Sequence, residues 1–86
     1  MKSVQFDPIA MQDFIEWATV DKKIFDKIAR LLGEVQRTPF TGIGKPEPLK
    51  HALQGCWSRR ITNDHRFVYR VQGEVVVILG CKNHYE

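Results

Sequence analysis

Apolar residues recur at helical spacing through most of the first 35 positions of the chain. Residues 3–6 read as a short strand. Asp7-Pro8 then supplies a side chain that can cap a helix and a proline at the first helical position, where its missing N–H costs nothing. Apolar side chains fall near one stripe from there to about residue 18, as an amphipathic helix requires: Ile9, Phe14, Trp17 and Ala18.

A second helix is predicted after a short break. Either Thr19 or Asp21 can cap it. Thr38-Pro39 ends it, because the residue before a proline is pushed away from helical angles. Between these signals, apolar residues return at three- and four-residue spacings: Ile24, Ile28, Leu31, Leu32 and Val35. Two helices joined by so short a connection predict a helical hairpin.

The second half of the chain changes to strand-like patterns. Residues 39–53 hold three prolines and two glycines, which indicates a loop shaped by restricted dihedrals. Strands are predicted over residues 57–61, 66–71 and 74–81, with turns at Asn63-Asp64 and Gln72-Gly73. The apolar run within the last strand is typical of a central strand covered at least partly on both faces.

The order β-α-α-β-β-β predicts a single α+β domain over residues 1–86, with a small antiparallel sheet and the helical hairpin packed on one face. No apolar run approaches a membrane span and no signal peptide is evident, so we expect a cytoplasmic protein. Cys56 and Cys81 lack the density of a secreted scaffold and are interpreted as buried thiols. A disulfide between neighbouring strands stays open as an alternative.

Charge is distributed unevenly along the chain, which carries a formal net charge of +3. Residues 1–44 hold six Lys or Arg and six Asp or Glu, which cancel. Residues 45–86 hold seven Lys or Arg against four acidic residues, and all three histidines. A polyanion would be drawn to this second half. A merely solubilising surface is the alternative reading of the same charges.

Several blocks from residue 37 onward resemble the YoeB/Txe branch of the RelE superfamily of toxin–antitoxin ribonucleases. The resemblance is collinear over nearly the whole chain and is densest in four blocks: Arg37-Thr38-Pro39-Phe40 through Gly42-x-Gly44-Lys45-Pro46-Glu47-Pro48-Leu49-Lys50-His51, Gly55-x-Trp57-Ser58-Arg59-Arg60-Ile61-Thr62, His65-Arg66-x-Val68-Tyr69, and His84-Tyr85. It implies a RelE-like fold and a toxin that cuts messenger RNA in the ribosomal A site. It also implies a partner antitoxin of the YefM/Phd kind, contact with operator DNA only through that antitoxin, and possible homodimers.

The resemblance also implies roles for individual residues. Cleaving RNA without a cofactor uses the 2′-hydroxyl as nucleophile, and needs a base, cations around the phosphorane and an acid for the leaving 5′-oxygen. Glu47 matches the general base, and His84 matches the general acid. Arg66 matches the phosphate clamp, and Tyr85 matches a ring that orients or stacks on RNA. Supporting RNA or phosphate contacts are expected from Lys45, Lys50, His51, Arg59 and Arg60, although alternation lets only one of the two adjacent arginines readily serve a given face.

Other functions remain as alternatives at this point. One is a RelE-like binding module or co-repressor that acts with an antitoxin and does not cut RNA. Another is a ribonuclease that works without the ribosome. A zinc site is not expected, because no two of the available ligands share a recognised ligand spacing: His51, Cys56, His65, Cys81 and His84.

Overall fold

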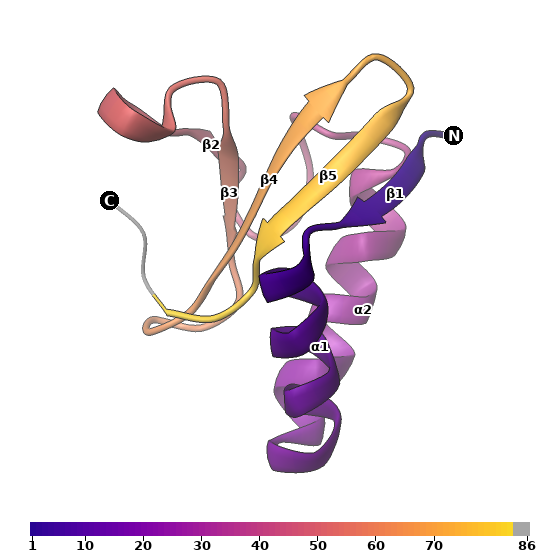
Figure 1. The fold of residues 1–86 in the computed structure, drawn as a ribbon, viewed down its shortest axis with the longest axis vertical. Coiled ribbons are helices and arrows are strands. Elements are labelled where there is room, and N and C mark those ends of the chain that lie inside the picture. Colours follow the sequence, from indigo (N-terminus) through magenta and orange to yellow (C-terminus); the bar gives the residue numbers. More distant parts are fainter. Residues whose placement is uncertain (84–86) are drawn as a thin grey trace.

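The computed structural model of the chain describes residues 1–83 and has the predicted order of elements. A strand, β1 (Ser3–Phe6), leads into two helices, α1 (Pro8–Val20) and α2 (Lys22–Val35). The strands β3 (Trp57–Arg60), β4 (Arg66–Gln72) and β5 (Val75–Gly80) follow. Two short elements lie in the loop before β3: a two-residue strand, β2 (Glu47–Pro48), and a 3₁₀ turn, η1 (His51–Leu53). Figure 1 shows both helices on one side of the sheet, with β2 and η1 projecting away from them.

The sheet has five strands in the order β1-β5-β4-β3-β2. Its pairs are antiparallel except that β1 runs parallel to β5, with Ser3 opposite Val75 and Phe6 opposite Ile78. The sheet is therefore mixed, where the sequence pattern predicted an antiparallel one. Parallel neighbours need a long connection, and here nearly the whole chain lies between the two strands. The α+β class and the helical hairpin on one face are confirmed.

The helix boundaries follow from local chemistry. Asp7 precedes α1 and Pro8 occupies its first turn, as predicted, although the Asp7 side chain makes no capping hydrogen bond. The Asp21 carboxylate accepts hydrogen bonds from the backbone N–H groups of Lys23 and Ile24 at 3.1 and 3.3 Å. Asp21 rather than Thr19 therefore caps α2.

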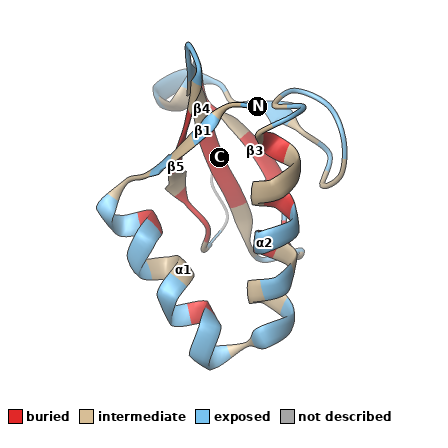
Figure 2. Cartoon of the chain, turned by 90° about the vertical axis from the view of Figure 1, so that its right-hand side faces the viewer, coloured by how far each residue is buried: buried red, intermediate tan, exposed pale blue. Residues whose placement is uncertain are grey.

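The main hydrophobic core fills the space between the helices and the sheet (Figure 2). The helices contribute the buried residues Ala10, Trp17, Ile28, Leu31 and Val35. The strands and the residues next to them contribute Ile61, Phe67, Tyr69, Val76, Ile78 and Cys81. Val68 and Val77 are also buried, but they lie outside this cluster. Strands β4 and β5 are therefore covered on both faces, which confirms the prediction of a central strand for the last apolar run.

Both cysteines are buried and free, in agreement with the prediction of buried thiols. Burial, with a smaller effect from the Asp13 carboxylate, raises the pKa of the Cys81 thiol to about 12. None of the helices described is long and apolar enough to cross a membrane.

Candidate catalytic face

The pleat of the sheet sorts the basic and acidic residues of strands β2 to β4 onto two faces. Residues directly opposite each other in an antiparallel pair point to the same face. Glu47 is opposite Ser58, and Ser58 is in turn opposite Val68. On the same strands, Arg60 is opposite Arg66. We call this side of the sheet the open face, because the alternate residues Trp57, Tyr69 and Ile78 are the ones that pack into the core beneath the helices.

The strand register places Glu47, Arg60 and Arg66 as neighbours on the open face. Side chains directly opposite have their Cβ atoms about 4.5–5.5 Å apart, and diagonal neighbours are about 7–8 Å apart. Arg60 and Arg66 are a direct pair, and Glu47 is a diagonal neighbour of Arg60 through Ser58. A guanidinium presents planar N–H donors that match the oxygens of a phosphate. The residue types on this face therefore suit a phosphate.

Arg66 is held at the start of β4 by the turn that precedes it. Its guanidinium Nη1 donates to the carbonyl oxygens of Thr62, Asn63 and His65 at 2.6, 3.3 and 3.2 Å. Its backbone N–H donates to the carbonyl of Asn83 at 2.8 Å. Carbonyls that bind one edge of a guanidinium limit the directions in which the group can turn.

The loop that carries Glu47 is pinned to the edge of β3. The Arg60 N–H donates to the Gly44 carbonyl at 2.6 Å, and the Leu49 N–H donates to the Cys56 carbonyl at 2.9 Å. Glu47 lies between these two attachments and is exposed. The sequence pattern assigned this stretch to loop, because Pro46 and Pro48 argue against a strand; β2 is an edge strand, where proline is tolerated.

The remaining predicted RNA contacts lie around this loop on the surface. Lys45, Lys50 and His51 are all exposed. Lys45 and His51 have positive φ angles of 51° and 58°, so the backbone turns sharply at both positions. The two lysines flank β2 in the chain, and Lys50 precedes η1.

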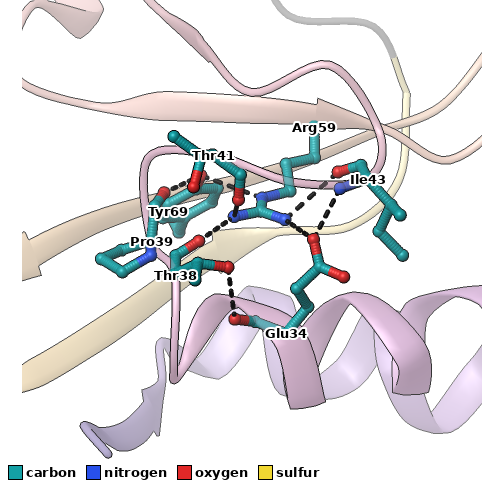
Figure 3. A network of polar contacts seen from close by, with 7 residues as sticks. All are labelled: Glu34, Thr38, Pro39, Thr41, Ile43, Arg59 and Tyr69. Carbon is teal, nitrogen blue, oxygen red and sulfur yellow. Dashed lines mark hydrogen bonds and ion pairs between the residues drawn. The ribbon is translucent and has the colours of Figure 1, made fainter.

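Arg59 is placed differently from the other predicted phosphate contacts. Its side chain is fully buried, and it lies on the opposite face from Arg60 because successive strand residues alternate. Figure 3 shows its guanidinium among Glu34, Tyr69 and the loop after α2. Its Nη1 lies 3.1 Å from the Glu34 carboxylate and its Nε donates to the Tyr69 hydroxyl at 3.2 Å. The guanidinium also donates to three carbonyls of the loop that follows α2: Thr38, Thr41 and Ile43. A guanidinium whose donors are used in this way has no exposed surface for a phosphate, so of the two adjacent arginines only Arg60 is available on the open face.

The buried cluster around Arg59 shapes the loop that leads to Glu47. The Glu34 carboxylate accepts a hydrogen bond from the Ile43 N–H at 2.5 Å. This bond, helped by Arg59, lowers the pKa of Glu34 against the opposing effect of burial. The Tyr69 hydroxyl donates to the Pro39 carbonyl at 2.6 Å, and burial raises the pKa of Tyr69. Sequence reasoning missed this cluster, because Glu34 and Arg59 are 25 residues apart and no local pattern links them.

Sequence reasoning also left Arg70 out of the site. It lies on the same strand and face as Arg66 and Val68, and it is half-buried. Its Nε donates to the side chain of Gln72 at 3.0 Å. The alternation of β4 was the signal that could have found it.

The two remaining predicted catalytic residues, His84 and Tyr85, lie outside the described residues. The described chain ends at Asn83, whose carbonyl accepts the Arg66 N–H. Within residues 1–83, no group of three or more His, Cys, Asp or Glu side chains is arranged to hold a metal ion.

Guanidinium groups can bind a phosphodiester, and a carboxylate near them can accept a proton from a hydroxyl next to that phosphate. Comparison with known proteins gives this face its context. Residues 6–85 match the family described as the YoeB-like toxin of bacterial type II toxin–antitoxin system. The chain belongs to this family. It is a type II toxin of the YoeB/RelE kind, which confirms the resemblance drawn from its sequence blocks.

Similar proteins support the assignment of this chain to the YoeB-like family, and their alignments cover most or nearly all of the chain. Toxin RelK of Mycobacterium tuberculosis H37Rv is 53% identical over 85 residues, which cover 99% of this chain and 100% of that relative. Toxin YoeB of Escherichia coli K12 is 52% identical over 73 residues, which cover 85% of this chain and 87% of the relative.

Solved structures of relatives have the same fold as this YoeB-like toxin. A YoeB/ParE toxin from Agrobacterium tumefaciens superposes with a TM-score of 0.91 at 41% identity, over 96% of this chain and 99% of the other. A chain of the YoeB–YefM complex from Staphylococcus aureus gives a TM-score of 0.89 at 41% identity, over 99% of both chains. A YafQ mutant from E. coli, at 12% identity and a TM-score of 0.81, shows that the fold alone extends further.

Proposed function

We propose that this toxin is an endoribonuclease that cuts messenger RNA in the ribosomal A site by general acid–base catalysis. The observation that carries the proposal is the strand register, which puts Glu47 and the cross-strand pair of Arg60 and Arg66 on one face of three neighbouring strands. Membership of the YoeB-like family supports the same activity. The exposed cations Lys45, Lys50 and Arg60 on and around this face are also what a polyanion requires.

In the proposed reaction, Glu47 takes the proton of the 2′-hydroxyl next to the scissile phosphate. The 2′-oxygen forms a bond to phosphorus while the bond from phosphorus to the 5′-oxygen breaks. Arg66 and Arg60 stabilise the charge that develops on the phosphoryl oxygens. His84 gives a proton to the leaving 5′-oxygen, and Tyr85 orients or stacks on the RNA. The products are a 2′,3′-cyclic phosphate and a 5′-hydroxyl, and no cofactor is consumed.

Substrate placement is assigned to the exposed basic residues around β2. Lys45, Lys50 and His51 would contact the RNA backbone on either side of the scissile phosphate. Phosphate contacts of this kind fix register without reading sequence, so the ribosome would choose the site by presenting the A-site codon. This step requires the toxin to act in the cytoplasm.

The toxin would be held inactive by a cognate antitoxin. The S. aureus relative forms a YoeB–YefM complex, and a heterotetrameric YoeB–YefM complex from the same organism is also known. A YoeB dimer from S. aureus supports a homodimer as the free state. An antitoxin segment that folds on binding would cover the open face, and the complex would contact operator DNA through the antitoxin.

The test uses purified toxin, ribosomes carrying a defined message, and the same message without ribosomes. We expect cleavage in the A site of the ribosome-bound message, with cyclic phosphate and 5′-hydroxyl ends identified chemically. A matched message with a 2′-deoxy nucleotide at the scissile position should resist cleavage, because it lacks the nucleophile.

Three results would contradict the proposal in different ways. Cleavage of the naked message alone would keep the chemistry and remove the ribosome from it. Cleavage of the 2′-deoxy message would exclude attack by the 2′-hydroxyl. No cleavage by a folded, antitoxin-free sample would favour a binding module that acts only with its antitoxin.

A further inference from the structure

The chain that leaves β5 is fastened to the rest of the molecule at three consecutive residues. The Trp17 Nε1–H donates to the Cys81 carbonyl at 2.9 Å. The Lys82 ammonium pairs with the Glu16 carboxylate at 2.8 Å. The backbone N–H and the carbonyl of Asn83 each make a hydrogen bond. Residues near a chain end usually fray unless they are tied down, so this segment is held in place by specific contacts.

Asn83 is fixed by two residues that adjoin each other in the chain. Its N–H donates to Nδ1 of His65 at 2.9 Å, and its carbonyl accepts the N–H of Arg66 at 2.8 Å. Its φ is +69°, a region that side chains other than glycine rarely adopt and that asparagine tolerates better than most. The two hydrogen bonds therefore hold a backbone conformation at Asn83 that is unfavourable for most residues.

The imidazole of His65 accepts the hydrogen bond from the Asn83 N–H through Nδ1. A backbone N–H can only donate, so Nδ1 must carry a lone pair, and the neutral ring must bear its proton on Nε2. The imidazole meets the ring of Trp17 edge-on, with centroids 4.8 Å apart and an interplanar angle of 75°. Trp17 is the residue whose indole holds the Cys81 carbonyl. One buried tryptophan thus orients both the exit of β5 and the acceptor for Asn83.

We propose that His65 is a positioning residue for the proposed general acid, because it fixes the backbone at Asn83, the residue that precedes His84 in the sequence. The inference rests on the proposed function, in which His84 is the general acid. His65 itself touches neither substrate nor reacting atoms. Its contribution is to remove conformational freedom from the backbone at Asn83, next in the sequence to the proposed proton donor.

Two substitutions separate the hydrogen bond from the packing of the ring. His65→Phe keeps an aromatic ring against Trp17 but has no acceptor for the Asn83 N–H. His65→Asn loses the ring but places an amide oxygen where Nδ1 stood. We expect His65→Phe to lower the cleavage rate at saturating programmed ribosomes by on the order of 100-fold with little change in KM. His65→Asn should restore much of that loss.

A change of leaving group tests whether the loss lies in proton donation. In a message with sulfur replacing the bridging 5′-oxygen at the scissile bond, the leaving thiolate needs no general acid. We expect the difference between wild type and His65→Phe to shrink markedly on this message. Asn83→Ile gives a second route to the same defect, because a β-branched residue resists positive φ. It should show the same rescue by the sulfur leaving group.

A measurement on the free protein complements the kinetics. The ¹⁵N chemical shifts of the His65 imidazole should report a proton on Nε2 and none on Nδ1 at neutral pH. A proton on Nδ1 would overturn the inference, as would equal losses for His65→Phe on the oxygen and sulfur messages. Wild-type activity in His65→Phe would do the same while leaving the proposed function intact. Failure of the wild-type protein to cleave either message would overturn the proposed function, and this inference with it.

Discussion

Arg59 and Arg60 are neighbours in the chain, yet they serve the two faces of one sheet in opposite ways. Arg59 is fully buried and binds Glu34, Tyr69 and the loop carbonyls, whereas Arg60 is exposed beside Arg66. The pleat alone makes this division, because successive side chains point to opposite faces. A basic residue within a family motif therefore need not contact the substrate. The inner arginine shapes the loop that presents Glu47, and the outer one lies on the face to which we assign the chemistry.

The first prediction is that a substitution of Glu47, on the open face, changes the rate of cleavage and leaves stability almost unchanged. Glu47→Gln should lower the rate of cleavage on ribosomes by about 10²–10⁴-fold, equivalent to about 3–5 kcal/mol of barrier, because the amide cannot accept the 2′-hydroxyl proton. The free energy of unfolding should change by no more than about 0.5 kcal/mol, because Glu47 is exposed. Single-turnover cleavage and urea denaturation measure the two quantities.

The matched control is Glu74→Gln, which removes an exposed carboxylate from the turn between β4 and β5, away from the open face. It should leave the cleavage rate near wild type. A Glu47→Gln enzyme as fast as this control would remove Glu47 from the chemistry.

The second prediction applies one substitution to both arginines. Arg59→Met keeps an apolar stem but removes every donor of the guanidinium, so that the Glu34 carboxylate and three loop carbonyls lose the hydrogen bonds that Arg59 gives them. We expect it to lower the free energy of unfolding by about 3–5 kcal/mol, the usual cost of breaking a buried ion pair. Arg60→Met should change it by about 0.5 kcal/mol or less, and should instead slow cleavage. Chemical denaturation of both variants measures the contrast, and equal stability would show that Arg59 is not the structural member of the pair.

The sequence could predict which residues alternate but could not predict which face each would meet. Alternation predicted that Arg59 and Arg60 lie on opposite faces of the sheet. It could not predict which of the two would be buried, because that depends on Glu34, which is distant in sequence and lies on another element. The helical hairpin, the central apolar strand and the cap at Asp21 rest on short-range signals, and all are present. The parallel pairing of β1 with β5, and the contact of His65 with Asn83, depend on tertiary packing that no local period records.

The third prediction concerns Gly42, in the loop that Arg59 holds. Its φ is +117°, and a Cβ placed there would lie 1.7 Å from the Glu34 carboxylate oxygen. Gly42→Ala should therefore displace the carboxylate from Ile43 and Arg59, in addition to straining the backbone. We expect a loss of about 1–3 kcal/mol in the free energy of unfolding.

Gly55 provides the control for this substitution. Its φ is +95°, but no atom lies within 4 Å of the position its Cβ would take. Gly55→Ala therefore reports the cost of the backbone strain alone. If thermal denaturation gave the same loss for both variants, the clash of the added Cβ at position 42 with the Glu34 carboxylate would cost no stability.

The last and smallest effect is a dependence of stability on pH. It comes from Glu34, which lies in the cluster around Arg59 on the helix side of the sheet. The hydrogen bond from the Ile43 N–H, helped by Arg59, lowers the pKa of Glu34 in the folded chain. A carboxyl whose pKa is lower when folded stabilises the protein above its ordinary pKa of about 4, and this contribution is lost as the pH falls through the folded value. Glu34→Gln should therefore flatten the decline of the unfolding free energy in that acidic range, whereas Glu74→Gln, at an exposed turn, should leave most of the decline in place. Parallel slopes for the wild type and Glu34→Gln across the acidic limb would mean that the charge of Glu34 does not contribute to the cluster around Arg59, and that the neutral hydrogen bonds alone hold the loop.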